Sequence, residues 1–73
     1  MEEKVLEIIN YIRKNKGLDL LSEINPSDSL RDVMEFTSFD LAELTVRIED
    51  EFDVDIFEDG LISTIGEIFD KLS

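Results

Sequence analysis

The sequence contains no cysteine and no histidine. Without cysteine the chain cannot form a disulfide, bind a metal through thiolates or use a thiol as a nucleophile. Without histidine it lacks the commonest general base and metal ligand of proteins. Neither a Ser-His-Asp nor a Cys-His catalytic apparatus can be built from this chain alone. Paired carboxylates could in principle supply acid–base chemistry, but we expect the obvious ones to lie on exposed helix faces, which do not tune carboxylates for catalysis. We therefore predict that the protein is not an enzyme and that it has no catalytic residues.

Long apolar segments are missing as well. No apolar run approaches the length needed to span a bilayer, and the first four residues, Met-Glu-Glu-Lys, lack the apolar segment of a signal peptide. We expect a cytoplasmic protein that does not bind membranes. With 73 residues, we expect one domain over residues 1–73, a single modest core and a monomeric state.

Positive charge is scarce: seven Lys and Arg residues stand against 19 Asp and Glu residues, which gives a net charge of −12. Residues 25–73 alone hold 14 acids and three bases. This imbalance excludes nucleic acid as a partner, because phosphate backbones are bound through Lys and Arg. It favours partners with basic patches, although the same acidity could serve only to keep a small protein soluble.

One acidic segment has the spacing of a calcium-binding loop in part. Counting from Asp55 as the first position, Gly60 falls correctly at the sixth. Phe57, however, occupies a ligand position, and Gly66 stands where a bidentate glutamate belongs. The match fails, and we predict no specific metal site.

Hydrophobic periodicity predicts helices at the two ends of the chain. The first covers residues 2–16 and ends at Gly17, which suits a left-handed cap. The last begins at Ser63-Thr64, where Thr64 and Glu67 have the spacing of a capping box. Residues 18–37 carry too many apolar side chains for a free linker, so we predict a loop packed over the core. Residues 58–62 can form only a short helix, which Gly60 weakens.

The central helix is predicted to begin at Thr37 or Ser38 and to end near Asp53, with Thr37 as its N-cap. A stripe formed by Leu41, Leu44, Ile48 and Phe52 should face the core. Phe39, Glu43, Val46 and Asp50 fall together on the opposite side. A Phe and a Val exposed among carboxylates are a candidate contact surface.

Ser38 opens this helix and is the candidate modification site. Serine at a helix N-terminus often does no more than cap the helix. A phosphate on Ser38 would, however, meet the backbone amides at the helix N-terminus, which favour anions. Ser38 is preceded by the loop that we expect to be ordered, and it is followed by Phe39, which we expect to be exposed.

Four segments in order give the chain a resemblance to free-standing bacterial acyl carrier proteins over nearly its whole length. They are Leu30-Arg-Asp-Val-Met34, Ser38-Phe-Asp-Leu-Ala-Glu-Leu44, Ile48-Glu-Asp-Glu-Phe-Asp-Val-Asp-Ile56 and Ile62-Ser-Thr-Ile65. The resemblance implies an all-α fold, an acyl-carrier-like bundle of three main helices plus one short helix with a long ordered first loop. It also implies that a phosphopantetheinyl transferase attaches 4′-phosphopantetheine from coenzyme A to Ser38.

In that family the thiol of the attached arm holds an acyl or aminoacyl group as a thioester, for use in fatty-acid, polyketide or other lipid biosynthesis. The resemblance implies docking to the basic patches of loading and processing enzymes. We expect the partner contacts to be Phe39, Asp40, Glu43, Val46 and Asp50. The side chains that we expect near the cargo are Leu41, Val46, Ile62, Ile65 and Ile68.

The match departs from the family pattern at the site itself. The family usually has Asp-Ser-Leu preceded by Gly, whereas this chain has Glu35-Phe-Thr-Ser-Phe39. The tripeptide Asp28-Ser29-Leu30 is present, but no second-helix pattern follows it in register, so we reject Ser29. Ser38-Phe39 is also similar to D-alanyl carrier proteins. The alternatives are therefore an aminoacyl carrier, or a carrier-like acidic interaction domain that is never modified.

Overall fold

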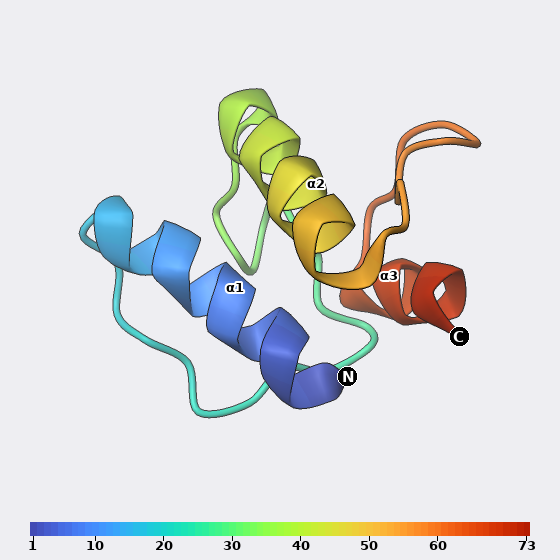
Figure 1. Cartoon of the computed structure of the whole chain (residues 1–73). Coiled ribbons are helices and arrows are strands. Elements are labelled where there is room, and N and C mark those ends of the chain that lie inside the picture. Colours follow the sequence, from blue (N-terminus) through green and yellow to red (C-terminus); the bar gives the residue numbers. More distant parts are fainter.

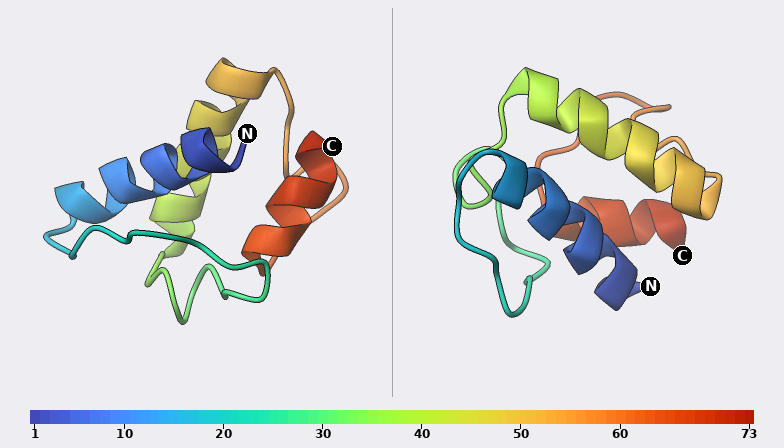
Figure 2. Two further views of the ribbon diagram at one scale, coloured as in Figure 1. Left: turned by 90° about the horizontal axis from the view of Figure 1, so that it is seen from below. Right: turned by 60° about the vertical axis from the view of Figure 1, so that its left-hand side comes forward.

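Three helices and two connecting segments make up the computed structural model, which describes residues 1–73 (Figure 1). They are α1 (Glu2–Asn15), α2 (Ser38–Phe52) and α3 (Ile65–Leu72). The predicted all-α class is confirmed, because the only β-type pairing is an isolated bridge between Ser29 and Thr64. In every view the two termini lie at one end of the molecule, and α2 begins at the other, beside the end of α1 (Figures 1 and 2).

The end of α1 is set by a glycine. Helical geometry stops at Asn15, one residue before the predicted end, and Lys16 is the C-cap. Gly17 follows with φ +80°, and its N–H donates to the carbonyl of Lys14 at 3.0 Å. Only glycine adopts this left-handed conformation without steric cost, so its predicted capping role is confirmed.

The hydrophobic core draws on all three helices and on both connections. Its thirteen buried apolar residues are Val5, Ile9, Ile12, Leu30, Met34, Phe36, Leu41, Leu44, Ile48, Ile56, Ile62, Ile65 and Ile68. Leu30, Met34 and Phe36 belong to the connection before α2, which confirms that this segment packs over the core. Of the stripe predicted on α2, Phe52 is partly buried and packs against the edge of the core.

Polar side chains of α1 hold both ends of that loop. The side-chain amide of Asn10 donates to the Leu21 carbonyl at 2.9 Å and accepts from the Leu21 N–H at 2.8 Å. Arg13 is 6% exposed. Its Nε donates to the carbonyl of Asp19 at 3.0 Å, and its Nη1 donates to the carbonyl of Met34 at 3.0 Å. One buried guanidinium therefore links the beginning of the loop to its end.

The middle of the loop is bonded to the beginning of α3, which it reaches in Figure 2. The N–H of Leu30 donates to the Ser63 carbonyl at 2.8 Å, and the N–H of Gly66 donates to the Pro26 carbonyl at 2.8 Å. A Cβ at position 66 would lie 3.0 Å from the Pro26 oxygen. The absence of a side chain at Gly66 is thus what allows the loop to come this close.

The short helix predicted over residues 58–62 does not form, and that prediction is wrong. The segment makes turns instead: the Asp55 carboxylate accepts from the N–H of Phe57 at 2.9 Å, and the Asp55 carbonyl accepts from the N–H of Glu58 at 3.3 Å. Gly60 has φ +123°, a conformation outside the helical region. The glycine ends the turn before a helix can be completed.

Candidate functional site

Ser38 is the first residue of α2, and the cap next to it is complete. The Oγ1 of Thr37 accepts from the N–H of Asp40 at 3.3 Å, and the Asp40 carboxylate accepts from the N–H of Thr37 at 2.8 Å. These reciprocal bonds form a capping box and confirm the predicted start of the helix. Ser38 itself takes no part in the cap, so its side chain is left exposed to solvent.

The lysine at the C-cap of α1 stabilises the same N-terminal cap of α2. Lys16 Nζ lies 2.5 Å from the Asp40 carboxylate and 2.6 Å from the carbonyl oxygen of Glu35. Burial tends to raise the pKa of Asp40, but the hydrogen bonds from Lys16 and Thr37 outweigh it and hold that pKa below its ordinary value. The Asp40 carboxylate therefore stays charged and bonded within the molecule. Its predicted role as a partner contact stays a prediction.

The backbone just before the cap is left-handed at a residue that is not glycine. Glu35 has φ +61°. This conformation costs a non-glycine residue roughly 1–2 kcal/mol. Glu35 lies between the buried side chains of Met34 and Phe36, and the residues that follow, Thr37 and Ser38, are exposed.

The hydroxyl of Ser38 accepts one hydrogen bond, from an arginine. Arg31 Nη2 donates to Ser38 Oγ at 2.9 Å, and the hydroxyl has no acceptor within the molecule for its own proton. The backbone N–H groups of Ser38 and Phe39 have no hydrogen-bond partner either. An anion bonded to this oxygen would meet a guanidinium and the free amides of the first helical turn.

A groove of about 360 Å³ lies beside Arg31. It is lined by Ser29, Arg31, Asp32, Leu41, Leu61, Ile62 and Ser63. Two of the side chains expected near a cargo, Leu41 and Ile62, lie in this groove. Ile65 and Ile68 are fully buried in the core, and Val46 is 62% exposed and does not line the groove.

The outward surface of α2 presents the apolar side chains that the helical periodicity placed there. Phe39 is 89% exposed and Val46 is 62% exposed, and Asp50 is also exposed. Glu43 is half-exposed, and its carboxylate accepts from Arg47 Nε at 2.8 Å. We call Phe39, Glu43, Val46 and Asp50 the outer face of α2.

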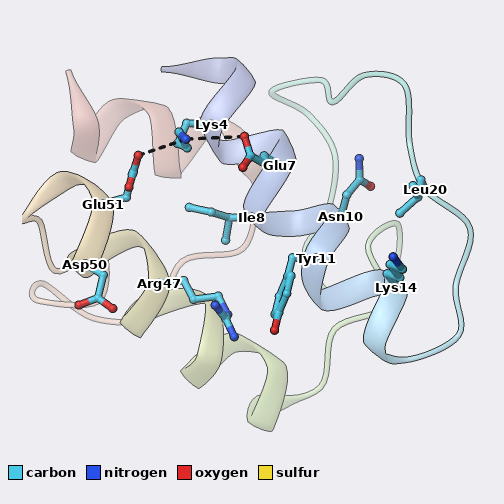
Figure 3. A pocket seen from close by; sticks show the side chains of 10 residues that line it. All are labelled: Lys4, Glu7, Ile8, Asn10, Tyr11, Lys14, Leu20, Arg47, Asp50 and Glu51. Carbon is cyan, nitrogen blue, oxygen red and sulfur yellow. Dashed lines mark ion pairs between the residues drawn. The ribbon is translucent and has the colours of Figure 1, made fainter.

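A larger groove, of about 450 Å³, lies between α1 and α2 (Figure 3). Tyr11 and Arg47 face each other in it, with the guanidinium 4.1 Å from the ring centre, a cation–π contact. At its far side, Lys4 Nζ lies 3.4 Å from the Glu51 carboxylate. None of the residues that line this groove belongs to the first turn of α2, so it is separate from the surroundings of Ser38.

Sequence reasoning missed the two arginines that organise this end of the molecule. Arg13 has the sequence signature of an exposed base near a helix C-terminus, and nothing local shows that it is buried. Arg31 lies in a loop and carried one faint signal, since it is one of only three bases among residues 25–73.

Comparison with known families gives one result. The family model described as the phosphopantetheine attachment site matches residues 6–72, so the chain belongs to this family. Members of the family carry a covalently attached 4′-phosphopantetheine, and their carrier domains are not catalytic themselves. The comparisons with curated proteins and with solved structures gave no match.

None of the three helices is both long enough and apolar enough to cross a bilayer. The acidic residues do not gather into any group of three or more that could hold a metal ion.

Proposed function

We propose that this chain carries acyl or aminoacyl intermediates as thioesters on a 4′-phosphopantetheine arm attached to Ser38, and that it passes them between biosynthetic enzymes. The observation that carries the proposal is the state of the Ser38 hydroxyl. It is exposed at the first residue of α2, its proton is unengaged, and Arg31 donates to its oxygen at 2.9 Å. Family membership supplies the kind of group to be attached.

The residues around Ser38 fit the phosphate end of this group. In the attachment reaction the Ser38 oxygen bonds to the phosphorus of coenzyme A that carries the pantetheine group. The bond from that phosphorus to the oxygen of the leaving adenosine 3′,5′-bisphosphate breaks. The hydroxyl proton passes to a base of the transferase. The N–H groups of Ser38 and Phe39 have no backbone acceptor within the molecule, so they would be available to the oxygens of the new phosphodiester. Once attached, the arm supplies the thiol that this cysteine-free chain lacks.

The groove beside Arg31 supports an acyl cargo over an aminoacyl one. Leu41, Leu61 and Ile62 contribute apolar side chains to its lining; Leu41 and Ile62 are buried, and Leu61 is 86% exposed. Burial of an apolar chain there would be favourable by roughly 0.8 kcal/mol per methylene. An aminoacyl carrier of the D-alanyl type is the alternative, and the similarity of Ser38-Phe39 to that class supports it.

The outer face of α2 is the docking surface that we propose for the partner enzymes. The exposed Phe39 and Val46 supply apolar contact, and the acids beside them favour basic patches. Because Arg47 already neutralises Glu43, Asp50 should contribute more to the association rate. Asp50→Lys should therefore slow transfer to a partner enzyme at low salt more than Glu43→Lys does. Equal transfer rates for wild type and both variants would show that the docking surface lies elsewhere on the molecule.

Modification of Ser38 is tested by intact mass. Wild type, Ser38→Ala and Ser29→Ala are incubated with coenzyme A and a broad-specificity phosphopantetheinyl transferase. We expect one phosphopantetheinyl group on wild type and on Ser29→Ala, and none on Ser38→Ala. Ser29 is the matched control because its Oγ is already bonded to the N–H of Asp32 at 3.0 Å in the packed loop.

Two outcomes would count against this proposal. Modification that persists in Ser38→Ala and disappears in Ser29→Ala would overturn the choice of site. Failure of every transferase to modify wild type would favour the other candidate, an interaction domain of the carrier family that is never loaded. Thr37→Asp restores the family's usual acid and still provides a good N-cap, so it should speed modification by a standard transferase.

A further inference from the structure

One cation in the acidic part of the chain has no carboxylate partner. Residues 25–73 contain three bases among 14 acids. Arg47 pairs with Glu43, and Lys71 pairs with Asp59. Arg31 forms no ion pair with any carboxylate, even though Asp32 is its neighbour in sequence and lines the same groove. Its charged group is bonded to the neutral hydroxyl of Ser38 instead.

The backbone that carries Arg31 is fixed, whereas its side chain is exposed. The carbonyl of Ser29 accepts from the N–H groups of Val33 at 3.1 Å and of Met34 at 3.0 Å, which closes a turn around position 31. Leu30, on one side of Arg31, is fully buried in the core. The turn therefore presents the guanidinium at the surface from an anchored position, so little backbone ordering would accompany binding of an anion.

We propose that Arg31 binds the phosphodiester that joins the phosphopantetheine arm to Ser38. This inference rests on the function proposed above and adds the residue that holds the base of the arm. The hydrogen bond from Arg31 already ends on the oxygen that becomes part of the phosphodiester. A guanidinium presents several N–H donors in one plane and pairs well with phosphate oxygens, so the contact gains a charge partner on modification.

The position of this contact favours the phosphodiester, and not a charged group on the cargo, as the anion that Arg31 binds. Arg31 Nη2 is 2.9 Å from the attachment oxygen itself, whereas a carboxylate on a cargo would be carried at the thiol end of the arm. Arg31 also lines the groove that contains Leu41 and Ile62. A phosphodiester held by Arg31 would therefore contact a residue that also lines this groove.

The test compares unmodified and modified protein for four sequences: wild type, Arg31→Gln, Arg31→Lys and Lys14→Gln. Lys14→Gln is the matched control, because it removes one positive charge from an exposed residue of α1 that has no ion-pair partner. Urea unfolding gives the ratio of unfolding constants before and after modification, and ³¹P NMR gives the position of the phosphodiester resonance. Intact mass confirms that each sample carries one arm at Ser38.

In wild type and Lys14→Gln the arm should leave the unfolding constant unchanged or lower it. In Arg31→Gln no guanidinium compensates the added negative charge. Modification should therefore raise the unfolding constant of Arg31→Gln about two- to fivefold relative to the change that it causes in wild type, the range of an exposed ion pair. The ³¹P resonance should move in Arg31→Gln and stay in place in Lys14→Gln. Arg31→Lys keeps the charge and should recover most of the stability.

Arg31→Gln and Lys14→Gln could give the same ratio of unfolding constants and the same ³¹P position. That result would overturn the role of Arg31 and would not affect the proposed carrier function. If wild type cannot be modified at all, the carrier proposal fails and the role of Arg31 fails with it. A slower modification rate in Arg31→Gln without either physical change would assign Arg31 to contact with the transferase, which also contradicts a bond to the phosphodiester.

Discussion

Replacement of Arg13 by methionine tests whether one buried guanidinium holds the loop that leads to Ser38. Methionine keeps the apolar stem but removes both hydrogen bonds to the loop. A hydrogen bond from a charged donor contributes about 1.5–3 kcal/mol. Met34 is buried, so loss of the hydrogen bond to its carbonyl should cost the full contribution of that bond. Asp19 is exposed, so water can replace the hydrogen bond to its carbonyl. We therefore expect Arg13→Met to cost about 1.5–3 kcal/mol of unfolding free energy.

A loss of that size approaches the whole stability of so small a domain, which is about 3–5 kcal/mol. The assay is urea unfolding followed by circular dichroism, with Lys14→Met as the control. Lys14 is the next residue, carries the same charge and is exposed, so its replacement should change the unfolding free energy by no more than about 0.5 kcal/mol. A cost below about 0.5 kcal/mol for Arg13→Met would show that the loop holds its path without α1, and would refute this reasoning.

Three other predictions can be checked by the same unfolding assay. Leu44 is fully buried, so Leu44→Ala should cost about 2–5 kcal/mol, and a change below half a kcal/mol would contradict its place in the core. At Glu35, glycine removes the left-handed strain but adds freedom to the unfolded chain, so Glu35→Gly should stay within about 1 kcal/mol of wild type, whereas Glu35→Val should be clearly destabilising. Because the pKa of Asp40 is lowered on folding, its contribution is present above its ordinary pKa of 3.8 and is lost as the pH falls through the lower, folded value. The stabilities of wild type and Asp40→Asn should thus converge below pH 3.8, and a constant difference between them down to pH 2 would exclude this linkage.

The helices could be predicted from the sequence because their signals are local. Gly17 after α1 and the capping pairs that begin at Thr37 and Thr64 act within four residues of the helix ends that they define. The stripe on α2 likewise follows from the helical period alone. These features gave the positions of the three helices and placed Ser38 at a helix start without any tertiary information.

The path of the loop could not be predicted, because its contacts join residues that are distant in sequence. Arg13 bonds to a carbonyl 21 residues away, and no pattern in α1 marks it as buried. The contact between Arg31 and Ser38 spans seven residues that include a left-handed turn at Glu35. A sequence rule would assign that conformation to glycine, which Glu35 is not.

The bonds between the loop and the beginning of α3 also bear on the order of events during synthesis. The loop segment that precedes Ser38 is held by residues 63–66, which are added to the chain well after it. At a translation rate of about 5–20 residues per second, these partners follow Ser38 after roughly 1–6 s. Until then Pro26 and Leu30 lack their bonds to Gly66 and Ser63, so the turn that presents Arg31 is not yet anchored to the beginning of α3. In a nascent chain Ser38 is therefore synthesised before its folded surroundings can form. A transferase that recognises the folded surface can modify Ser38 only after the beginning of α3 has been synthesised.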